Sequence, residues 1–212
     1  MSTINPLIAA VQQAGSALEL LQSTAELARS GDPGAAPTLV EVLSFNNPGA
    51  AVAAVDGLIA IGPPAVDHLL QLDPRNYGAR AWAVRALAGI GDVRGLDLLI
   101  EALLDDVGPS VRRAAARGLG SLQLMALDPL QRSAIEQRCL EALLRGCSDG
   151  EWVVRYAVAM GLEGLALSGG WPADHRGHGR TTAALTQLSD AAHEDAPVVR
   201  LRAALALQRL SH

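Results

Sequence analysis

One spacing of apolar residues recurs five times in this sequence and constrains its fold more than any other feature. Each copy has an apolar residue at its end and at the positions three, seven and eleven residues before that end. The five ends are Ile61, Ile90, Leu122, Leu165 and Leu210. Residues spaced in this way lie along one side of an α-helix. Each copy therefore predicts a helix that buries one stripe of side chains.

A second set of apolar segments lies between these predicted helices. They are APTLVEVLSF, PAVDHLLQL, RGLDLLIEALL and RSAIEQRCLEALLRG. The joints contain Gly, which ends helices, and Asp or Pro, which begin them. Each unit is therefore a pair of helices, and such pairs bury their apolar faces only by stacking. We predict a single domain over 1–212, with capping helices at 1–32, five helix-pair repeats at 33–212 and a loop containing Gly and His at 167–182.

Stacked helix pairs of this kind are typical of HEAT repeats, which the sequence resembles over nearly its whole length. The resemblance implies an all-α fold, a right-handed α-solenoid of about five to six helix pairs. The composition agrees with this fold, because half of the residues are hydrophobic but only 3% are aromatic. Small apolar side chains let helices approach each other closely, whereas a sheet sandwich would need more aromatic and β-branched residues.

The charge and cysteine content exclude several classes of protein. The 17 basic and 22 acidic residues give a net charge of −5, which argues against a broad nucleic-acid surface. Cys139 and Cys147 lie in apolar helical segments and are interpreted as reduced, packed side chains. The N-terminal residues lack the basic start of a signal peptide, and no apolar run reaches the roughly 18 residues of a membrane span. We predict a cytoplasmic protein that binds neither nucleic acid nor a membrane.

Arginine stands ten residues before the end of four of the five copies, at Arg80, Arg112, Arg155 and Arg200. A side chain that nearly every unit needs is explained more simply by stacking than by a ligand. In HEAT-like repeats such an arginine typically bonds a neighbouring turn or acidic residue. We therefore predict that these four arginines are structural.

The opposite side of each repeated helix carries side chains that differ between copies. If the second helix of each pair lines the concave side, as is usual in HEAT repeats, three neighbouring units form one inner surface. Arginine pairs bidentately with carboxylates and aromatic rings cover apolar faces, so this surface suits a flat, conjugated, anionic ligand or an acidic protein. The alternative is that its members are ordinary solvated arginines and groove-packing aromatics. They are Tyr77, Arg85, Arg113, Arg117, Trp152, Tyr156 and Met160.

Two kinds of residue border this predicted surface. Trp82, on a flank of its helix, either fills a gap between repeats or borders the pocket, and we include it among the candidate ligand-binding residues. The outer copies are aliphatic on the same face, at Val52 and Ile59 and at Leu201 and Leu205. Exposed apolar ends of a solenoid commonly contact a partner chain, so we expect a hetero-oligomer.

The sequence contains no motif of a self-contained enzyme. It has no nucleophile elbow, no P-loop and no dinucleotide-binding fingerprint. Trp171, His175 and His178 fall in the predicted loop at 167–182, and two His three residues apart could begin a metal site. A glycine-loosened surface loop explains them better. We predict no metal site and assign no catalytic residue.

Three stretches resemble a more specific family. They are NYGARAWAVRALAGIGD, RGLDLLIEAL and PSVRRAAARGLG. They resemble the F-type (beta) subunit of the heterodimeric E/F phycobilin lyases, the CpcE/CpcF family of cyanobacteria. The chain length and the arrangement of units also resemble that subunit.

The resemblance implies a bilin lyase subunit that is active only with an E-type partner subunit. Such a lyase attaches phycocyanobilin, a linear tetrapyrrole, to a cysteine of the phycocyanin alpha subunit through a thioether bond. Phycocyanobilin is then a bound substrate, and no cofactor is implied. Because the thiol belongs to the acceptor, this chain would hold and position the bilin.

The register of the repeats assigns roles in that reaction. The bilin propionates would suit Arg85, Arg113 and Arg117, and the pyrrole rings would lie between the aromatic residues. Glu163 and Asp56 are weaker candidates for an acidic group near the pyrrole nitrogens.

Some F-type relatives also isomerise the bilin and carry an adjacent His-Cys pair. Here Cys139 follows Arg138 and Cys147 follows Gly146, so attachment without isomerisation is favoured. The alternative function is a non-enzymatic HEAT-repeat adaptor or scaffold acting on phycobilisome proteins. It would use the same solenoid and the apolar outer units.

Overall fold

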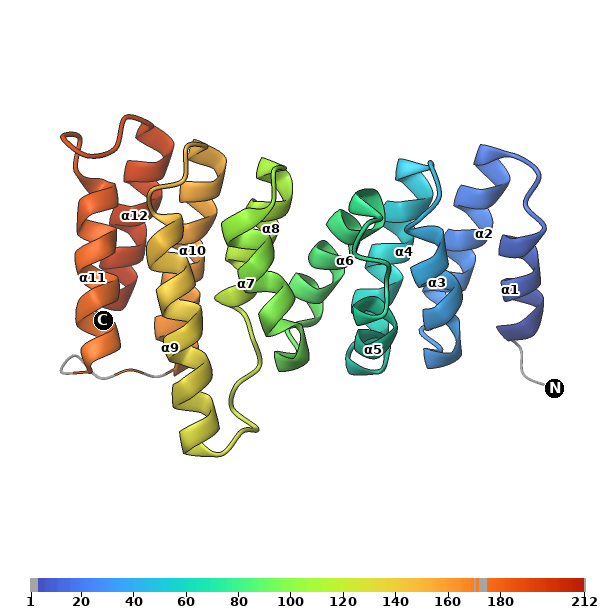
Figure 1. Cartoon of the computed structure of the whole chain (residues 1–212), viewed down its shortest axis with the longest axis horizontal. Helices are drawn as coiled ribbons and strands as arrows, with labels where there is room; N and C mark the ends of the chain where they lie inside the picture. The colour runs from blue at the N-terminus through green and yellow to red at the C-terminus, as the bar shows by residue number, and fades with distance from the viewer. Residues whose placement is uncertain (1–3, 170, 172–174, 212) are drawn as a thin grey trace. The chain divides into compact units, whose positions relative to one another are not determined.

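The structure, a computed structural model, describes residues 4–169, 171 and 175–211 (Figure 1). All regular elements in these ranges are helices, so the predicted all-α fold class is confirmed. The sequence predicts one solenoid domain over 1–212, whereas contacts within the chain divide it into two compact units, Met1–Gly95 and Leu96–His212.

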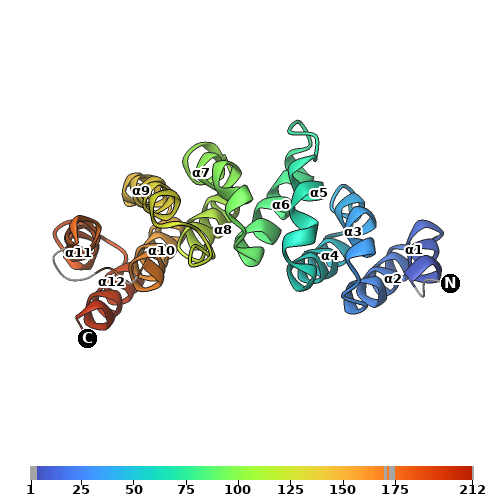
Figure 2. The same cartoon turned by 90° about the horizontal axis from the view of Figure 1, so that it is seen from below.

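The first unit stacks helix pairs in two layers. Its helices are α1 (Ile4–Gln12), α2 (Ala17–Arg29), α3 (Ala36–Val42), α4 (Pro48–Ile61), α5 (Val66–Leu70) and α6 (Tyr77–Ile90). Helices α2, α4 and α6 pack side by side in one layer, while α3 and α5 pack in the other (Figure 2). The pair α1 and α2 occupies the region predicted as capping helices.

The second unit repeats this arrangement with longer helices. They are α7 (Leu96–Asp105), α8 (Pro109–Leu119), α9 (Pro129–Gly146), α10 (Trp152–Gly169), α11 (Arg176–Ser189) and α12 (Pro197–Leu210). Helices α8, α10 and α12 form one layer, and α7, α9 and α11 form the other (Figure 2). The second helix of each predicted pair thus lies in the same layer within its unit.

The repeated apolar stripe forms the core between the two layers. All four stripe positions are buried in each of the first four copies. In the last copy Val199 and Ala203 are buried, whereas Leu207 and Leu210 are only half-buried. Helix α8 ends at Leu119, three residues before the end of its copy, and Leu122 is buried just beyond it.

Glycines bring the backbones of α8 and α10 into direct contact. A Cβ atom on Gly161 would lie 2.4 Å from the carbonyl oxygen of Ala116, and one on Gly120 would lie 2.3 Å from that of Gly161. A Cβ atom on Gly164 would likewise lie 2.5 Å from the carbonyl oxygen of Gly120. Close-packed interiors do not accommodate such overlaps, so only glycine fits at these positions.

The predicted loop at 167–182 is wrong at both ends, because α10 continues through Gly169 and α11 begins at Arg176. His175 stabilises the start of α11, since its side chain accepts a hydrogen bond from the backbone N–H of Gly177. A Cβ atom on Gly177 would lie 3.0 Å from the ring of Trp171. Gly177 therefore makes room for the packing of Trp171. Residues 170 and 172–174 of the predicted loop lie outside the described residues.

No single helix in the described ranges is long and apolar enough to cross a membrane. Among the described residues, one pair of helical segments, α4 and Pro63–Leu70, reaches that length and composition when taken together, with a bend of 120° between them.

Replacing Gly161 by alanine should lower the free energy of unfolding by about 2 kcal/mol, because the added methyl group collides with the backbone of α8. The matched control is Gly179→Ala, since Gly179 is also helical but has no atom within 4 Å of a built Cβ. That change should raise the free energy of unfolding by up to about 1 kcal/mol. Urea denaturation followed by circular dichroism measures both values. Similar effects of the two substitutions would contradict the close contact.

Candidate functional site

The arginines at the repeated position bind the turns between helices. Arg112 on α8 donates to both carboxylate oxygens of Asp149, at 2.7 and 3.0 Å, and to the backbone carbonyls of Asp106 and Val107. Asp149 belongs to the turn that leads into α10. Arg112 therefore joins the turn before its own helix to the turn before the next helix in the same layer.

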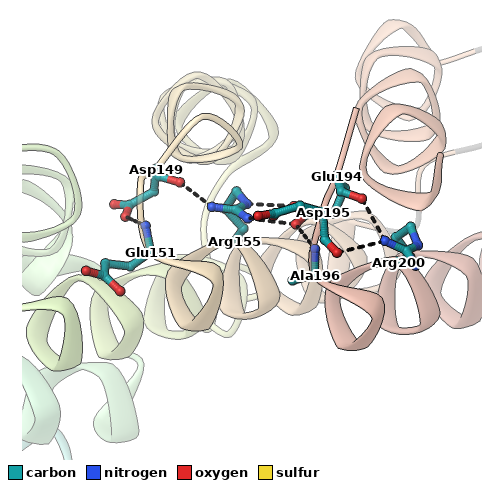
Figure 3. A network of polar contacts seen from close by, with 7 residues as sticks. All are labelled: Asp149, Glu151, Arg155, Glu194, Asp195, Ala196 and Arg200. Atoms are coloured by element: carbon teal, nitrogen blue, oxygen red, sulfur yellow. Dashed lines mark hydrogen bonds and ion pairs between the residues drawn. The ribbon is translucent and has the colours of Figure 1, made fainter. Parts of the chain in front are cut away.

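Arg155 on α10 forms the same kind of contacts in the next helix-pair repeat (Figure 3). It donates to both carboxylate oxygens of Glu194 at 2.6 Å and to the carbonyl of Asp149 at 2.8 Å. The guanidinium group lowers the pKa of Glu194 to about 2. Arg200 donates to the carbonyls of Glu194 and Asp195. The structural role predicted for Arg112, Arg155 and Arg200 is thus confirmed, and we call these three side chains the arginine clamps.

Two other arginines on α8 have no such partners. Arg113 and Arg117 are exposed, and neither guanidinium group forms an ion pair or hydrogen bond with any residue that the structure describes. They stand one turn apart on the helix side opposite the buried stripe. Their charges are therefore available to a ligand, unlike that of Arg112 beside them.

The neighbouring helix α10 presents aromatic residues on the same face of the layer. Trp152 is 48% exposed, and Tyr156 and Met160 are half-buried. All three occupy repeat positions equivalent to those on the outward side of α8, and α8 and α10 are in contact. The second unit thus brings together five of the eight candidate residues. We call them the arginine–aromatic surface: Arg113, Arg117, Trp152, Tyr156 and Met160.

The other three candidate residues lie on α6 in the first unit. Tyr77 is 78% exposed, and Arg85 is also exposed. The guanidinium carbon of Arg85 lies 5.9 Å from the ring centroid of the half-buried Trp82, which is within cation–π range. Trp82 therefore borders the exposed face of α6. A surface that continues across both units stays a prediction.

The aliphatic residues expected to contact a partner are exposed to different degrees. Leu201 and Leu205 on α12 are 72% and 40% exposed, and Val198 on the same helix side is 46% exposed. In the first unit Val52 is 38% exposed, whereas Ile59 is half-buried. The stronger apolar patch therefore lies on α12, in the same layer as the arginine–aromatic surface.

Comparison with known proteins places this geometry in a family. A family model described as HEAT repeats matches residues 69–136. The phycocyanin alpha phycocyanobilin lyase CpcF of Synechocystis sp. (strain PCC 6803) is 53% identical over 164 residues, which is 77% of each chain. The bilin biosynthesis protein RpcF of Synechococcus sp. (strain WH8020) is 50% identical over 100% of this chain and 99% of its own.

The chain belongs to the F-type (beta) subunits of the CpcE/CpcF phycobilin lyase family. A solved structure agrees: that of the complex of CpcE and CpcF of phycocyanin lyase from Nostoc sp. PCC7120 matches with a TM-score of 0.72 and 41% sequence identity. The match covers 82% of this chain and 99% of that one. The predicted family resemblance is therefore confirmed.

Neither cysteine of this F-type chain is suited to nucleophilic attack. Cys139 is fully buried and Cys147 is half-buried. Burial raises the pKa of each thiol to about 12, so both are protonated at neutral pH. The thiolate is the nucleophilic form of cysteine, so the interpretation of both as packed side chains is confirmed.

The acidic residue suggested for the pyrrole nitrogens is already occupied. Glu163 is buried, and its carboxylate accepts hydrogen bonds from Arg202 and, at 3.2 Å, from Arg209. Both arginines belong to α12, so Glu163 joins α10 to α12. Sequence reasoning missed this contact because Arg202 stands at a position that is apolar in the other copies.

Two residues of the predicted Gly/His loop, Trp171 and His175, form contacts within the second unit. The indole N–H of Trp171 donates to Glu136 on α9 at 3.0 Å, and its ring stacks on His175 with the centroids 5.0 Å apart. Among the described residues, no group of three or more His, Cys, Asp or Glu side chains could hold a metal ion. Trp171 and His175 therefore connect α9 to the start of α11.

Replacing Arg155 by methionine should lower the free energy of unfolding by about 3 kcal/mol at pH 7, because it leaves the carboxylate of Glu194 buried without its partner. Arg113→Met is the matched control and should change that energy by less than about 0.5 kcal/mol, because Arg113 is exposed and forms no ion pair with any described residue.

The same two variants should also differ in how much stability they lose at low pH. Arg155 holds the pKa of Glu194 at about 2, below its ordinary value of 4.5. The stabilisation is therefore complete above about pH 4.5 and is lost as the pH falls towards 2. Urea unfolding between pH 7 and pH 2.5 should show a smaller acid loss in Arg155→Met than in Arg113→Met. Equal losses would contradict the role of the clamp.

Proposed function

We propose that the chain is the F-type subunit of a heterodimeric phycobilin lyase and that it binds phycocyanobilin on the arginine–aromatic surface. It presents the bilin for thioether attachment to a cysteine of the phycocyanin alpha subunit. The observation that carries this proposal is the contrast between the arginine clamps and Arg113 and Arg117, which form no ion pair with any described residue. These two arginines lie on the same face of the layer as the exposed Trp152 and the half-buried Tyr156. The activity is inferred from the family, and the position of the bilin-binding site is inferred from this contrast.

The surface matches the chemistry of a linear tetrapyrrole. A bilin is flat and conjugated, and its propionates are carboxylates at neutral pH. Arg113 and Arg117 offer two forked guanidinium groups to these carboxylates without breaking an existing ion pair. Trp152 and Tyr156 offer rings that cover the apolar faces of the pyrroles, and Met160 adds a polarizable side chain that adapts to an irregular surface.

For the attachment reaction, this chain has to position the bilin; it does not have to provide an acid or a base. The S–H of the acceptor cysteine adds across an exocyclic carbon–carbon double bond of the bilin. One C–S bond and one C–H bond form, no group leaves and no oxidant or reductant is consumed. Holding the bilin against an incoming thiol makes the reaction effectively intramolecular, which accelerates it strongly. Because the thiols of the buried Cys139 and the half-buried Cys147 are protonated at neutral pH, they do not compete for the bilin.

Because this chain holds the bilin and the acceptor provides the thiol, the reaction requires other protein chains. The E-type subunit completes the lyase, as family membership implies. The acceptor must approach the bilin, and the exposed Leu201 and Leu205 on α12 provide an apolar surface beside α10 for a protein chain. The reaction is attachment without isomerisation, because neither cysteine is preceded by histidine.

Co-expression of this chain with the E-type subunit, the bilin and the phycocyanin alpha subunit should give a covalent, fluorescent adduct on the alpha subunit and none on this chain. Replacing both Arg113 and Arg117 by alanine should weaken bilin binding by about tenfold or more, because two charge-assisted contacts are lost. Fluorescence titration of the heterodimer with free bilin measures the affinity, and denaturing gels with zinc-enhanced fluorescence measure the adduct.

The matched control is Arg145→Ala. Arg145 is an exposed arginine on α9, in the other layer of the same unit, and its loss should leave bilin affinity unchanged within about twofold. An adduct that forms equally well without this chain would contradict the lyase assignment. Unchanged affinity in the double variant would contradict the proposed surface. Tight binding of phycobilisome proteins without any bilin binding would favour the adaptor function instead.

A further inference from the structure

Three charged side chains form a cluster between α10 and α12. The carboxylate of Glu163 on α10 accepts hydrogen bonds from Arg202 and, at 3.2 Å, from Arg209, which both lie on α12. Only 5% of the Glu163 side chain and 8% of the Arg202 side chain are exposed, whereas the Arg209 side chain is 57% exposed. We call these three residues the Arg–Glu–Arg cluster. It has a buried base and one exposed guanidinium group.

Stacking of the repeats does not require these charges. The position of Arg202 holds alanine in three of the other copies and tryptophan in the fourth. The position of Arg209 holds alanine, glycine or serine, and the position of Glu163 is uncharged in every other copy. Well-packed apolar side chains also stabilise a fold at least as well as a buried group of two arginines and one glutamate. The cluster therefore points to a role other than stacking.

The cluster carries more positive charge than its own carboxylate neutralises. Two guanidinium groups share the single carboxylate of Glu163, and neither forms an ion pair with any other described residue. The Nη1 atom of Arg202 is buried and has no hydrogen-bond partner in the described part of the chain. Arg209 forms one hydrogen bond there, through its Nη1 atom. Its remaining N–H groups can therefore bind a second carboxylate.

The cluster lies at one end of the arginine–aromatic surface. Glu163 follows Trp152, Tyr156 and Met160 along α10 at steps of four, four and three residues. At about 100° per residue, these four side chains fall within about 80° around the helix. Helix α10 contacts α8 on one side and α12 on the other (Figure 2). The rings of α10 therefore lie between the exposed arginines of α8 and the exposed Arg209 of α12.

We propose that Arg209 binds a propionate of the bilin and that Glu163 and Arg202 position its guanidinium group. This inference rests on the proposed function, because it extends the same binding surface. Glu163 holds the guanidinium of Arg209 from below. Arg202 neutralises Glu163, so the positive charge of Arg209 stays available to an anion. With Arg113 and Arg117 on the other side of α10, the surface offers guanidinium groups to both propionates of a linear tetrapyrrole.

A bilin carboxylate fits this place better than a carboxylate of a protein chain. The rings of Trp152 and Tyr156 lie on the same side of α10 as Glu163 and cover the faces of a flat, conjugated molecule. An aspartate or glutamate side chain of a partner would use the guanidinium of Arg209 without using these rings. The two sources of a carboxylate are separated by the test.

The test is fluorescence titration of the heterodimer with phycocyanobilin and with its dimethyl ester, whose carboxylates are blocked. Arg209→Gln should weaken binding of the free acid by about five- to tenfold, because one charge-assisted contact is lost. It should change the affinity for the ester by less than about twofold. Unchanged affinity for the free acid would overturn the proposal. Equal losses for the acid and the ester would also overturn it, because the loss would not depend on a carboxylate.

The matched control is Arg145→Gln, which makes the same chemical change at an exposed arginine in the other layer of the unit. It should change neither affinity by more than about twofold. Because Arg209 is largely exposed, Arg209→Gln should keep the fold, and circular dichroism with thermal melting checks this.

Glu163→Gln tests the positioning role separately. It removes the carboxylate that holds Arg209 but raises the positive charge of the cluster. If position matters, the folded variant binds the free acid more weakly and discriminates less between the acid and the ester. Tighter binding of the free acid would show that charge alone attracts the bilin, and the positioning role would be wrong.

The outcomes distinguish this inference from the proposed function. If replacing Arg113 and Arg117 weakens bilin binding but Arg209→Gln does not, the proposed function stands and this inference fails. If Arg209→Gln weakens binding of the free acid alone but the unmodified heterodimer forms no adduct, the propionate site stands and the lyase assignment fails. If Arg209→Gln weakens binding of the E-type subunit or of the bilin-free alpha subunit and leaves bilin affinity unchanged, the cluster binds a protein carboxylate and the proposal is wrong.

Discussion

The backbone contact between α8 and α10 determines how the second unit is arranged. Gly120, Gly161 and Gly164 leave no space for a Cβ atom between the two helices. Arg112 then fixes their ends, because it binds Asp149 in the turn that leads into α10. With spacing and register both fixed, side chains at equivalent positions of the two helices lie on one face. The arginine–aromatic surface depends on this arrangement, since α8 carries its arginines and α10 its aromatic residues.

Arginine has two distinct roles in this chain, although Arg112 and Arg113 are adjacent. Arg112 faces the turns, where the half-buried carboxylate of Asp149 and the carbonyl oxygens of Asp106 and Val107 accept its hydrogen bonds. Arg113 lies about 100° further round the helix, on the outward side, and bonds no acceptor among the described residues. A helix that uses one arginine for stacking therefore leaves the next one exposed, on the face where we propose that the bilin binds. This division lets a repeat protein keep its scaffold constant while single positions change to suit a substrate.

The repeated sequence pattern was sufficient to predict the helices, their core stripe and the structural role of the clamps. Each of these features depends on positions that recur, so the role predicted for a residue in one copy can be checked at the equivalent position in the other copies. Features that occur once were harder to predict. The burial of Glu163 by Arg202 and Arg209 depends on a single non-repeating residue, and the helical start at Arg176 depends on the packing of Trp171. The contact at Gly161 was missed because glycine in a helix does not by itself indicate a backbone approach.

We propose that the outward face of α8 and α10 holds the bilin, and a crystal structure of the heterodimer with bound phycocyanobilin would test this. We expect pyrrole rings to contact Trp152 and Tyr156, and at least one propionate to lie within hydrogen-bond distance of Arg113 or Arg117. A bilin bound to the α7, α9 and α11 layer, or held by the partner subunit alone, would contradict it.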